Sequence, residues 1–137
     1  MSLVLIDTSL WIEFFSKNPR ISPHLLLQLS HVIAEGEAAL IEPVRAELLS
    51  GHIIPKVRDE IEKAFDALDM IDRDWGSRDI WEEIISLADT AKSKRLPIPG
   101  IVDRMIVLSA LHAQATVASL DKGLIKLAQA IGISIFR

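Results

Sequence analysis

Short apolar runs alternate along this chain with longer segments of helical spacing, and this alternation restricts the fold more than any other feature. Five short apolar runs are candidate strands: SLVLI (2–6), AALI (38–41), MI (70–71), TVASL (116–120) and ISIF (133–136). Their residues are mostly apolar without an alternating polar side, which is typical of strands covered on both faces. We therefore predict about five strands in a central, mainly parallel sheet.

The segments between these runs repeat apolar residues at helical spacing. The clearest is 22–36, which starts with a Ser22 cap and Pro23 and ends at Gly36. Further helices are predicted at 8–16, 42–51, 54–69, 79–95, 100–113 and 122–132. The order β-α-α-β-α-α-β-α-α-β-α-β predicts an α/β fold, a three-layer α/β/α sandwich formed by residues 1–137 as a single domain.

The composition limits the location and the chemistry of the protein. The 137 residues have a formal net charge of −4 and include no cysteine. Disulfides, zinc–thiolate sites, iron–sulfur clusters and cysteine nucleophiles are therefore excluded, and a bound metal must use oxygen or imidazole ligands. No apolar run approaches the roughly 18 residues that cross a bilayer, and the start lacks a signal-peptide pattern. We expect a cytoplasmic protein that does not contact membranes.

Four carboxylates are predicted to meet at one edge of the sheet. Ligands of open parallel sheets bind beyond the carboxyl ends of the strands, and Asp7 and Asp121 each directly follow a predicted strand. Asp103 falls in the first turn of the helix after the LPIPG stretch. Glu47 lies in the helix that follows the second strand. All four side chains are candidates for one shared site.

Each acid also has a purely structural explanation. Asp7 and Asp121 are suited to capping the helices that follow them, and Asp103 suits the first turn of a helix. Glu47 has the position of an ordinary surface charge. Together, however, these like charges would repel one another unless protons or a cation compensate them.

Ligand chemistry connects such a cluster to a reaction. Sites built only from oxygen ligands favour Mg²⁺ or Mn²⁺ over softer metals. An ion of this kind activates water and stabilises negative charge on a phosphoryl oxygen, which suits phosphodiester hydrolysis.

Competing motifs have little support in the chain. The four histidines lack H-E-x-x-H spacing, and we expect packing or surface roles for His24, His31, His52 and His112. Neither of the two glycine-rich nucleotide-binding fingerprints is present. Position 9 is Ser9 where a phosphoaspartate-type phosphatase would have a second aspartate.

Four blocks of the sequence match a known pattern. LIDTSLWIEFF, PVRAELLSG, GIVDRMIVLSALHA and ASLDKGLIKLAQAIGI resemble, in order and spacing, a PIN-domain protein of the VapC toxin type over essentially the whole chain. The resemblance implies a magnesium-dependent ribonuclease that is neutralised by a cognate antitoxin and assembles as a homodimer. It also implies the members of the metal and catalytic site, which are Asp7, Glu47, Asp103 and Asp121, with a hydroxyl of Thr8 or Ser9 assisting at the first acid.

The last block departs from the family pattern. The family usually has a threonine two residues before the final aspartate and an aromatic residue three after it, whereas this chain has Ser119 and Leu124. Ser119 keeps the hydroxyl, so the main loss is apolar bulk. We expect Asp121 to be the least direct of the four ligands.

The substrate is less visible in the sequence. Five basic residues near the acidic edge are candidates to attract an RNA backbone, although each also suits a solvated surface: Lys92, Lys94, Arg95, Arg104 and Lys122. Two other functions stay open. One is a non-catalytic PIN-like module that binds RNA or protein, and the other is a metal-dependent phosphohydrolase acting on DNA or small phosphates.

The predicted helix at 8–16 is apolar around more than one face. Either part of its surface receives a partner or the helix is buried between its neighbours. If it receives a partner, polar substitution of Trp11 or Phe15 should weaken antitoxin binding more than folding.

Overall fold

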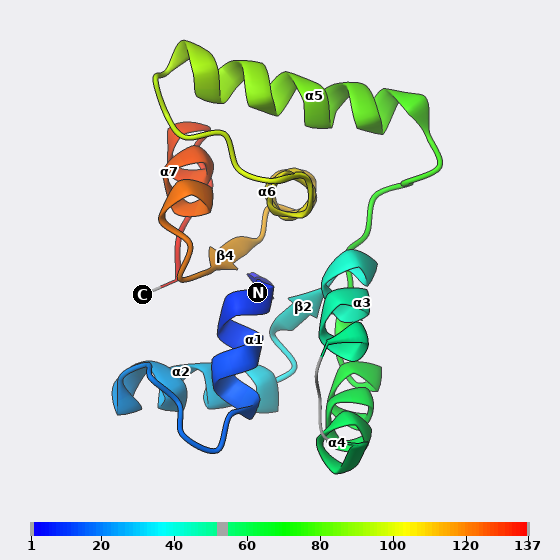
Figure 1. The fold of residues 1–137 in the computed structure, drawn as a ribbon, viewed down its shortest axis with the longest axis vertical. Helices are drawn as coiled ribbons and strands as arrows, with labels where there is room; N and C mark the ends of the chain where they lie inside the picture. Colours follow the sequence, from blue (N-terminus) through cyan, green and yellow to red (C-terminus); the bar gives the residue numbers. More distant parts are fainter. Residues whose placement is uncertain (1, 52–54, 137) are drawn as a thin grey trace.

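A computed structural model describes residues 2–51 and 55–136 and places four parallel strands at the centre of the molecule (Figure 1). The strand order is β3-β2-β1-β4. The strands are β1 (Val4–Ile6), β2 (Ala38–Leu40), β3 (Asp69–Met70) and β4 (Thr116–Ala118). The predicted parallel sheet is confirmed, and β1 lies inside it with a neighbour on each side.

The fifth predicted strand is reduced to a single bridge. Ile135 pairs in parallel with Val117, whose N–H donates to Ser134 O at 3.0 Å and whose carbonyl accepts from Phe136 N at 2.9 Å. Gly132 supplies the turn before this segment with a φ of +87°, a left-handed conformation that favours glycine. The segment thus closes the β4 edge of the sheet over two hydrogen bonds.

Helices cover both faces of the sheet, as predicted. They are α1 (Thr8–Phe15), α2 (Pro23–Ala34), α3 (Glu42–Ser50), α4 (Pro55–Asp66), α5 (Arg78–Ser93), α6 (Ile101–Ala113) and α7 (Lys122–Ala130). In Figure 1, α1, α2 and α4 lie below the strands, α3 lies beside β2, and α5 to α7 lie above the strands. Two parts of the prediction, the start of the fourth helix at Ile54 and the role of His52, lie outside the described residues. None of the helices in the described ranges is long and apolar enough to cross a membrane.

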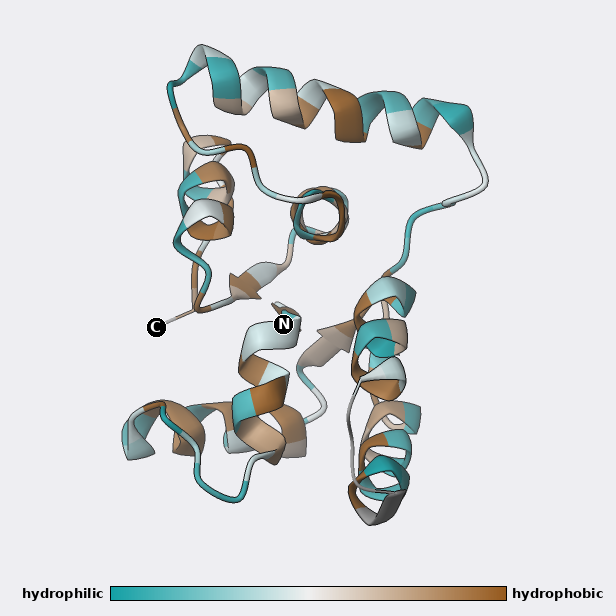
Figure 2. Cartoon of the chain, in the orientation of Figure 1, coloured by the Kyte–Doolittle hydropathy of each residue, from teal (hydrophilic) through white to brown (hydrophobic). Residues whose placement is uncertain are grey.

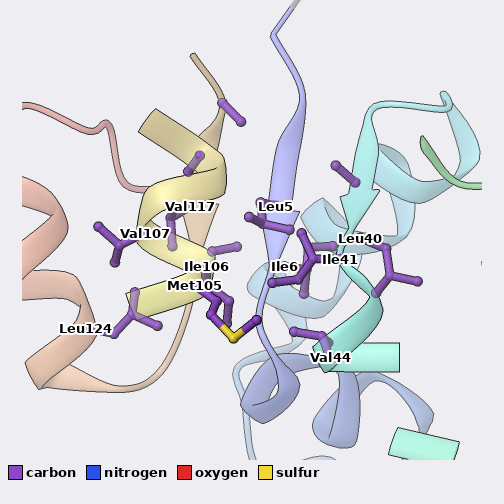
Figure 3. Close-up of a cluster of buried hydrophobic side chains, with 14 of the residues drawn as sticks. Leu5, Ile6, Leu40, Ile41, Val44, Met105, Ile106, Val107, Val117 and Leu124 are labelled. Atoms are coloured by element: carbon purple, nitrogen blue, oxygen red, sulfur yellow. The ribbon is translucent and has the colours of Figure 1, made fainter. Parts of the chain in front are cut away.

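The core lies between the sheet and these helices. All residues of β1 and β2 are buried, in agreement with the lack of alternation in their sequences. Helix α6 is buried from Met105 to Ala110 and is largely brown in Figure 2, which marks it as hydrophobic. Figure 3 shows buried aliphatic side chains of the strands and of α3, α6 and α7 gathered around β1.

Helix α1 is packed more deeply than a surface helix. Trp11 is fully buried and its ring contacts Phe15 and Phe65, with ring centroids 5.8 and 5.1 Å apart. The suggestion that Trp11 offers free surface to a partner is therefore wrong, because neighbouring helices cover it. Ile12 is the residue of α1 that stays open, with 54% of its surface exposed.

Candidate active site

The register of the sheet brings Asp7 beside the end of β4. Ile6 pairs with Ala118, and Asp7 N donates to Ala118 O at 3.0 Å. The Asp7 carboxylate is buried. Its Oδ1 accepts from Ser9 Oγ at 2.6 Å and from Leu10 N at 3.2 Å, while its Oδ2 accepts from Ser119 Oγ. Asp7 thus caps α1, as its structural explanation requires, and is also held from β4.

Burial dominates the electrostatics of Asp7. Removal from water raises its pKa above the usual range, and the hydrogen bonds from Ser119, Ser9 and Leu10 oppose this rise because they stabilise the charged form. The charge of Asp121 adds to the rise. Asp7 is therefore a buried acid that lies within electrostatic range of a second site acid.

The pKa of Asp103 is raised by the charges of the other three site acids. It is half-buried in the first turn of α6, and burial is the largest cause that raises its pKa to about 6. The charges of Asp121, Asp7 and Glu47 contribute to the same rise, in that order. Asp103 therefore lies within electrostatic range of the other three predicted site acids.

Glu47 is held by α3 and by a hydroxyl from α1. Thr8 Oγ1 donates to Glu47 Oε1 at 2.9 Å. The N-cap of α3 is Ile41, whose side chain cannot cap the helix, and Asp72 supplies the missing acceptor by accepting from Glu42 N at 2.9 and 3.1 Å. The end of β3 therefore fixes the helix that carries Glu47.

Asp121 combines a capping role with its position at the site. Its Oδ1 accepts from Leu124 N at 3.0 Å and caps α7, while the side chain stays exposed. Its own N–H donates to Ser119 Oγ at 2.9 Å. Ser119 therefore connects Asp121 to Asp7, which is consistent with Asp121 being the least direct of the four acids.

The predicted basic contacts divide into two groups. Lys92, Lys94 and Arg95 are exposed at the end of α5, and Lys122 is exposed beside Asp121. Arg104 instead donates to two backbone carbonyls of its own chain, Pro99 O and Ile84 O, both at 3.0 Å. It holds the connection before α6 in place, so it positions Asp103, the residue next to it.

Two residues that hold parts of the site, Ser119 and Asp72, were not among the predicted site residues. Ser119 had a signal, because it stands where the family pattern has a hydroxyl. Asp72 also had one, since an acid two residues after the third strand lies at the same edge of a parallel sheet. What the sequence did not indicate is the partner of each side chain.

The four acids offer the oxygen ligands that a hard metal ion prefers, although their side chains are not arranged around one common position. Within 2–51 and 55–136, no group of three acidic, histidine or cysteine side chains is arranged to hold an ion as it stands. The oxygens of Asp7 and Glu47 accept hydroxyl groups instead. The donors are all carboxylate oxygens, which Mg²⁺ and Mn²⁺ favour. A cation would offset the negative charges that raise the pKa of Asp103. The donor set therefore suits such an ion in its chemistry, while its present arrangement does not close around one.

Comparisons with known proteins agree with this fold. The family model described as PIN domain matches residues 4–130. Among solved structures, the crystal structure of FitAcB from Neisseria gonorrhoeae is 19% identical, with a TM-score of 0.70 and coverage of 98% of this chain and 97% of that one. A structure of FitAB bound to an IR36 DNA fragment is 17% identical, with a TM-score of 0.71 and coverage of 98% and 94%.

A third similar structure comes from another organism. It is VapBC2 from Rickettsia felis bound to a DNA fragment from their promoter, with 19% identity, a TM-score of 0.66 and coverage of 98% of this chain and 97% of that one. The comparison with curated proteins gives no match. At these identities the three structures establish a shared fold, while the family model covers nearly the whole chain.

Proposed function

Because the chain belongs to the PIN domain family, we propose that it is a ribonuclease of the VapC toxin type, which cleaves RNA phosphodiester bonds with a metal-activated water. The observation that carries the proposal is Asp103, whose pKa is raised to about 6 by burial and by the charges of the other three acids. Perturbed carboxylates gathered where parallel strands end are typical of a catalytic site.

Asp7, Glu47, Asp103 and Asp121 would hold Mg²⁺ or Mn²⁺. The bound ion would supply a Lewis acid for the phosphoryl oxygen and would lower the pKa of an attacking water. Ser9 and Ser119 hold the Asp7 carboxylate from two sides, and Thr8 holds Glu47.

The experiment that tests this function compares substrates and metals. We expect the protein to cut single-stranded or structured RNA in Mg²⁺ or Mn²⁺ and to lose that activity in EDTA. Cleavage of DNA or of a phosphomonoester without cleavage of RNA would support the other phosphohydrolase instead. RNA binding without cleavage in any of these metals would support the non-catalytic module.

The pKa of Asp103 predicts how metal binding depends on pH. A proton and a cation compete for this carboxyl group, so the rise in Tm on adding Mg²⁺ should be large at pH 7.5 and mostly lost at pH 5, below the pKa of about 6. Without metal the sign is opposite. A raised pKa makes Asp103 favour the folded state most below its ordinary value of 3.8, and this contribution is lost as pH rises through 6. An equal Mg²⁺ effect on Tm at both pH values would contradict the competition.

We further propose that a cognate antitoxin neutralises the protein and that the protein assembles as a homodimer, as the resemblance implies. A groove of about 410 Å³ lies between α1, α3 and α4 and includes Ile12, Leu48 and Ile61 as well as the site residue Glu47. An antitoxin segment in this mostly apolar groove would lie directly beside the acids. A short neighbouring gene for a DNA-binding protein would support the pairing, and the mass of the protein in solution tests the dimer.

Ile12 gives a selective test of the antitoxin contact. Ile12→Ser should weaken antitoxin binding by about tenfold, because an exposed aliphatic side chain of the groove would be buried by the partner. Ile85→Ser is the matched control, since Ile85 is also 54% exposed but lies on α5. Titration of the antitoxin against both variants, with Tm as a folding check, measures the difference. Equal affinities would remove the groove from the interface.

A further inference from the structure

A second hollow lies where the connection between α1 and α2 meets the loop between β4 and α7. Its volume is about 450 Å³, within the range of small-molecule sites. Six residues line it: Glu13, Arg20, Ile21, Ser22, Leu25 and Leu120. The aliphatic members form an apolar wall, and the two charged members form an ion pair.

Two hydrogen bonds connect the wall of the hollow to Asp7. Leu120 N donates to Ser9 Oγ at 3.2 Å, and Ser9 Oγ donates to Asp7 Oδ1 at 2.6 Å. The Leu120 side chain is 45% exposed and is part of the wall of the hollow. Only two hydrogen bonds therefore separate the wall of the hollow from Asp7.

The Arg20 guanidinium is hydrogen-bonded to Glu13 through Nε, while most of the Arg20 side chain is exposed to solvent. Its Nε donates to Glu13 Oε1 at 3.0 Å, and its backbone N donates to the same oxygen at 3.3 Å. The Glu13 side chain is 5% exposed, whereas the Arg20 side chain is 87% exposed. A buried carboxylate thus orients a guanidinium whose remaining donors face solvent, an arrangement suited to a phosphate group.

We propose that this hollow binds one nucleotide of the RNA strand next to the cleavage position. The base packs on Leu120, Ile21 and Leu25, and Arg20 contacts a phosphate while Glu13 positions the guanidinium. The inference rests on the proposed ribonuclease function. A nucleotide is favoured because the site pairs an apolar wall with an oriented cation beside acids that would otherwise repel a phosphate chain.

The first test locates the base. RNA oligonucleotides that the wild type cleaves are prepared with a single abasic residue at each position around the cut. One adjacent position should weaken binding to the wild type by roughly tenfold, because the missing base no longer buries apolar surface against the aliphatic wall. Leu120→Ala should weaken binding of the intact RNA and should make that same abasic position nearly neutral. Leu27→Ala is the matched control, because Leu27 is exposed on α2 and does not line the hollow.

The second test examines the phosphate contact. Arg20→Gln should reduce the slope of log affinity against log salt by roughly 0.7, the value for one phosphate contact on a single strand. Arg58→Gln is the control, since Arg58 makes the same Nε contact to Glu62 at 3.2 Å on α4. Loss of folding alone would lower Tm and the active fraction without changing the slope of the protein that remains folded.

The outcomes separate this inference from the proposed function. A wild type that does not cleave RNA overturns both. RNA cleavage in which Leu120→Ala leaves the abasic profile unchanged overturns the nucleotide site alone, even if Arg20→Gln fails to fold. Unchanged RNA binding together with weaker antitoxin binding in the Leu120 and Arg20 variants would assign the hollow to the protein partner and overturn the inference.

Discussion

Asp7→Asn and Asp103→Asn should each lower the rate of RNA cleavage in Mg²⁺ by roughly 100-fold or more. Mutation of residues that merely hydrogen-bond to metal ligands already lowers activity by about 10- to 100-fold, and these two acids are proposed as ligands themselves. Each change replaces one carboxylate of the proposed metal site by a neutral amide, which is a weaker ligand for a hard cation. The measurement is the initial rate of RNA cleavage at saturating Mg²⁺ and pH 7.5.

Both variants should fold as the wild type does, and their Tm values check this. Asparagine caps helices as well as aspartate does, so Asp7→Asn keeps the acceptor for Leu10 N, and loss of a repelling charge should not lower Tm. Asp89→Asn is the matched surface control, because Asp89 is exposed on α5. Full cleavage activity in both site variants would mean that the acids do not form the active site.

Trp11→Ala should reduce the free energy of unfolding by about 3 to 5 kcal/mol, the usual cost of removing a buried aromatic side chain. Trp11 is fully buried, and its ring packs against three phenylalanines, which are Phe14, Phe15 and Phe65. Urea unfolding measures the change. Ile12→Ala, on the open side of the same helix, should stay within about 0.5 kcal/mol of the wild type.

The indole nitrogen makes a second variant informative. Within the described residues, the buried Nε1 of Trp11 has no hydrogen-bond partner. Trp11→Phe keeps an aromatic ring and removes this unpaired donor, so it should cost far less than Trp11→Ala, about 1 kcal/mol or less. A loss for Trp11→Phe as large as that for alanine would show that the full indole shape, and not aromatic packing in general, holds α1.

The sequence was sufficient to predict the layers and the edge at which the acids gather. Both depend on the order of strands and helices, and the rule for the carboxyl ends of parallel strands needs no side-chain detail. Asp7 and Asp121 follow strands and Asp103 begins a helix, so their positions follow from the topology.

Side-chain partners could not be predicted in the same way. The bond from Ser119 to Asp7 joins residues 112 positions apart, and no local pattern records that distance. The buried state of Trp11 depends on α4, which supplies Phe65, and the ion pair of Glu13 with Arg20 depends on how the connection folds back. The fifth strand was overestimated because an apolar run indicates burial, whereas pairing also requires a neighbour along its whole length.

The position of β1 between β2 and β4 has a consequence for the timing of synthesis. Asp7 is synthesised before the strand that holds its other side, β4, which lies more than 100 residues further along the chain. A nascent chain that ends before Asp103 lacks two of the four acids and the hydroxyl of Ser119. The complete acidic site can therefore form only after synthesis has passed Asp121, the last of its four acids along the chain.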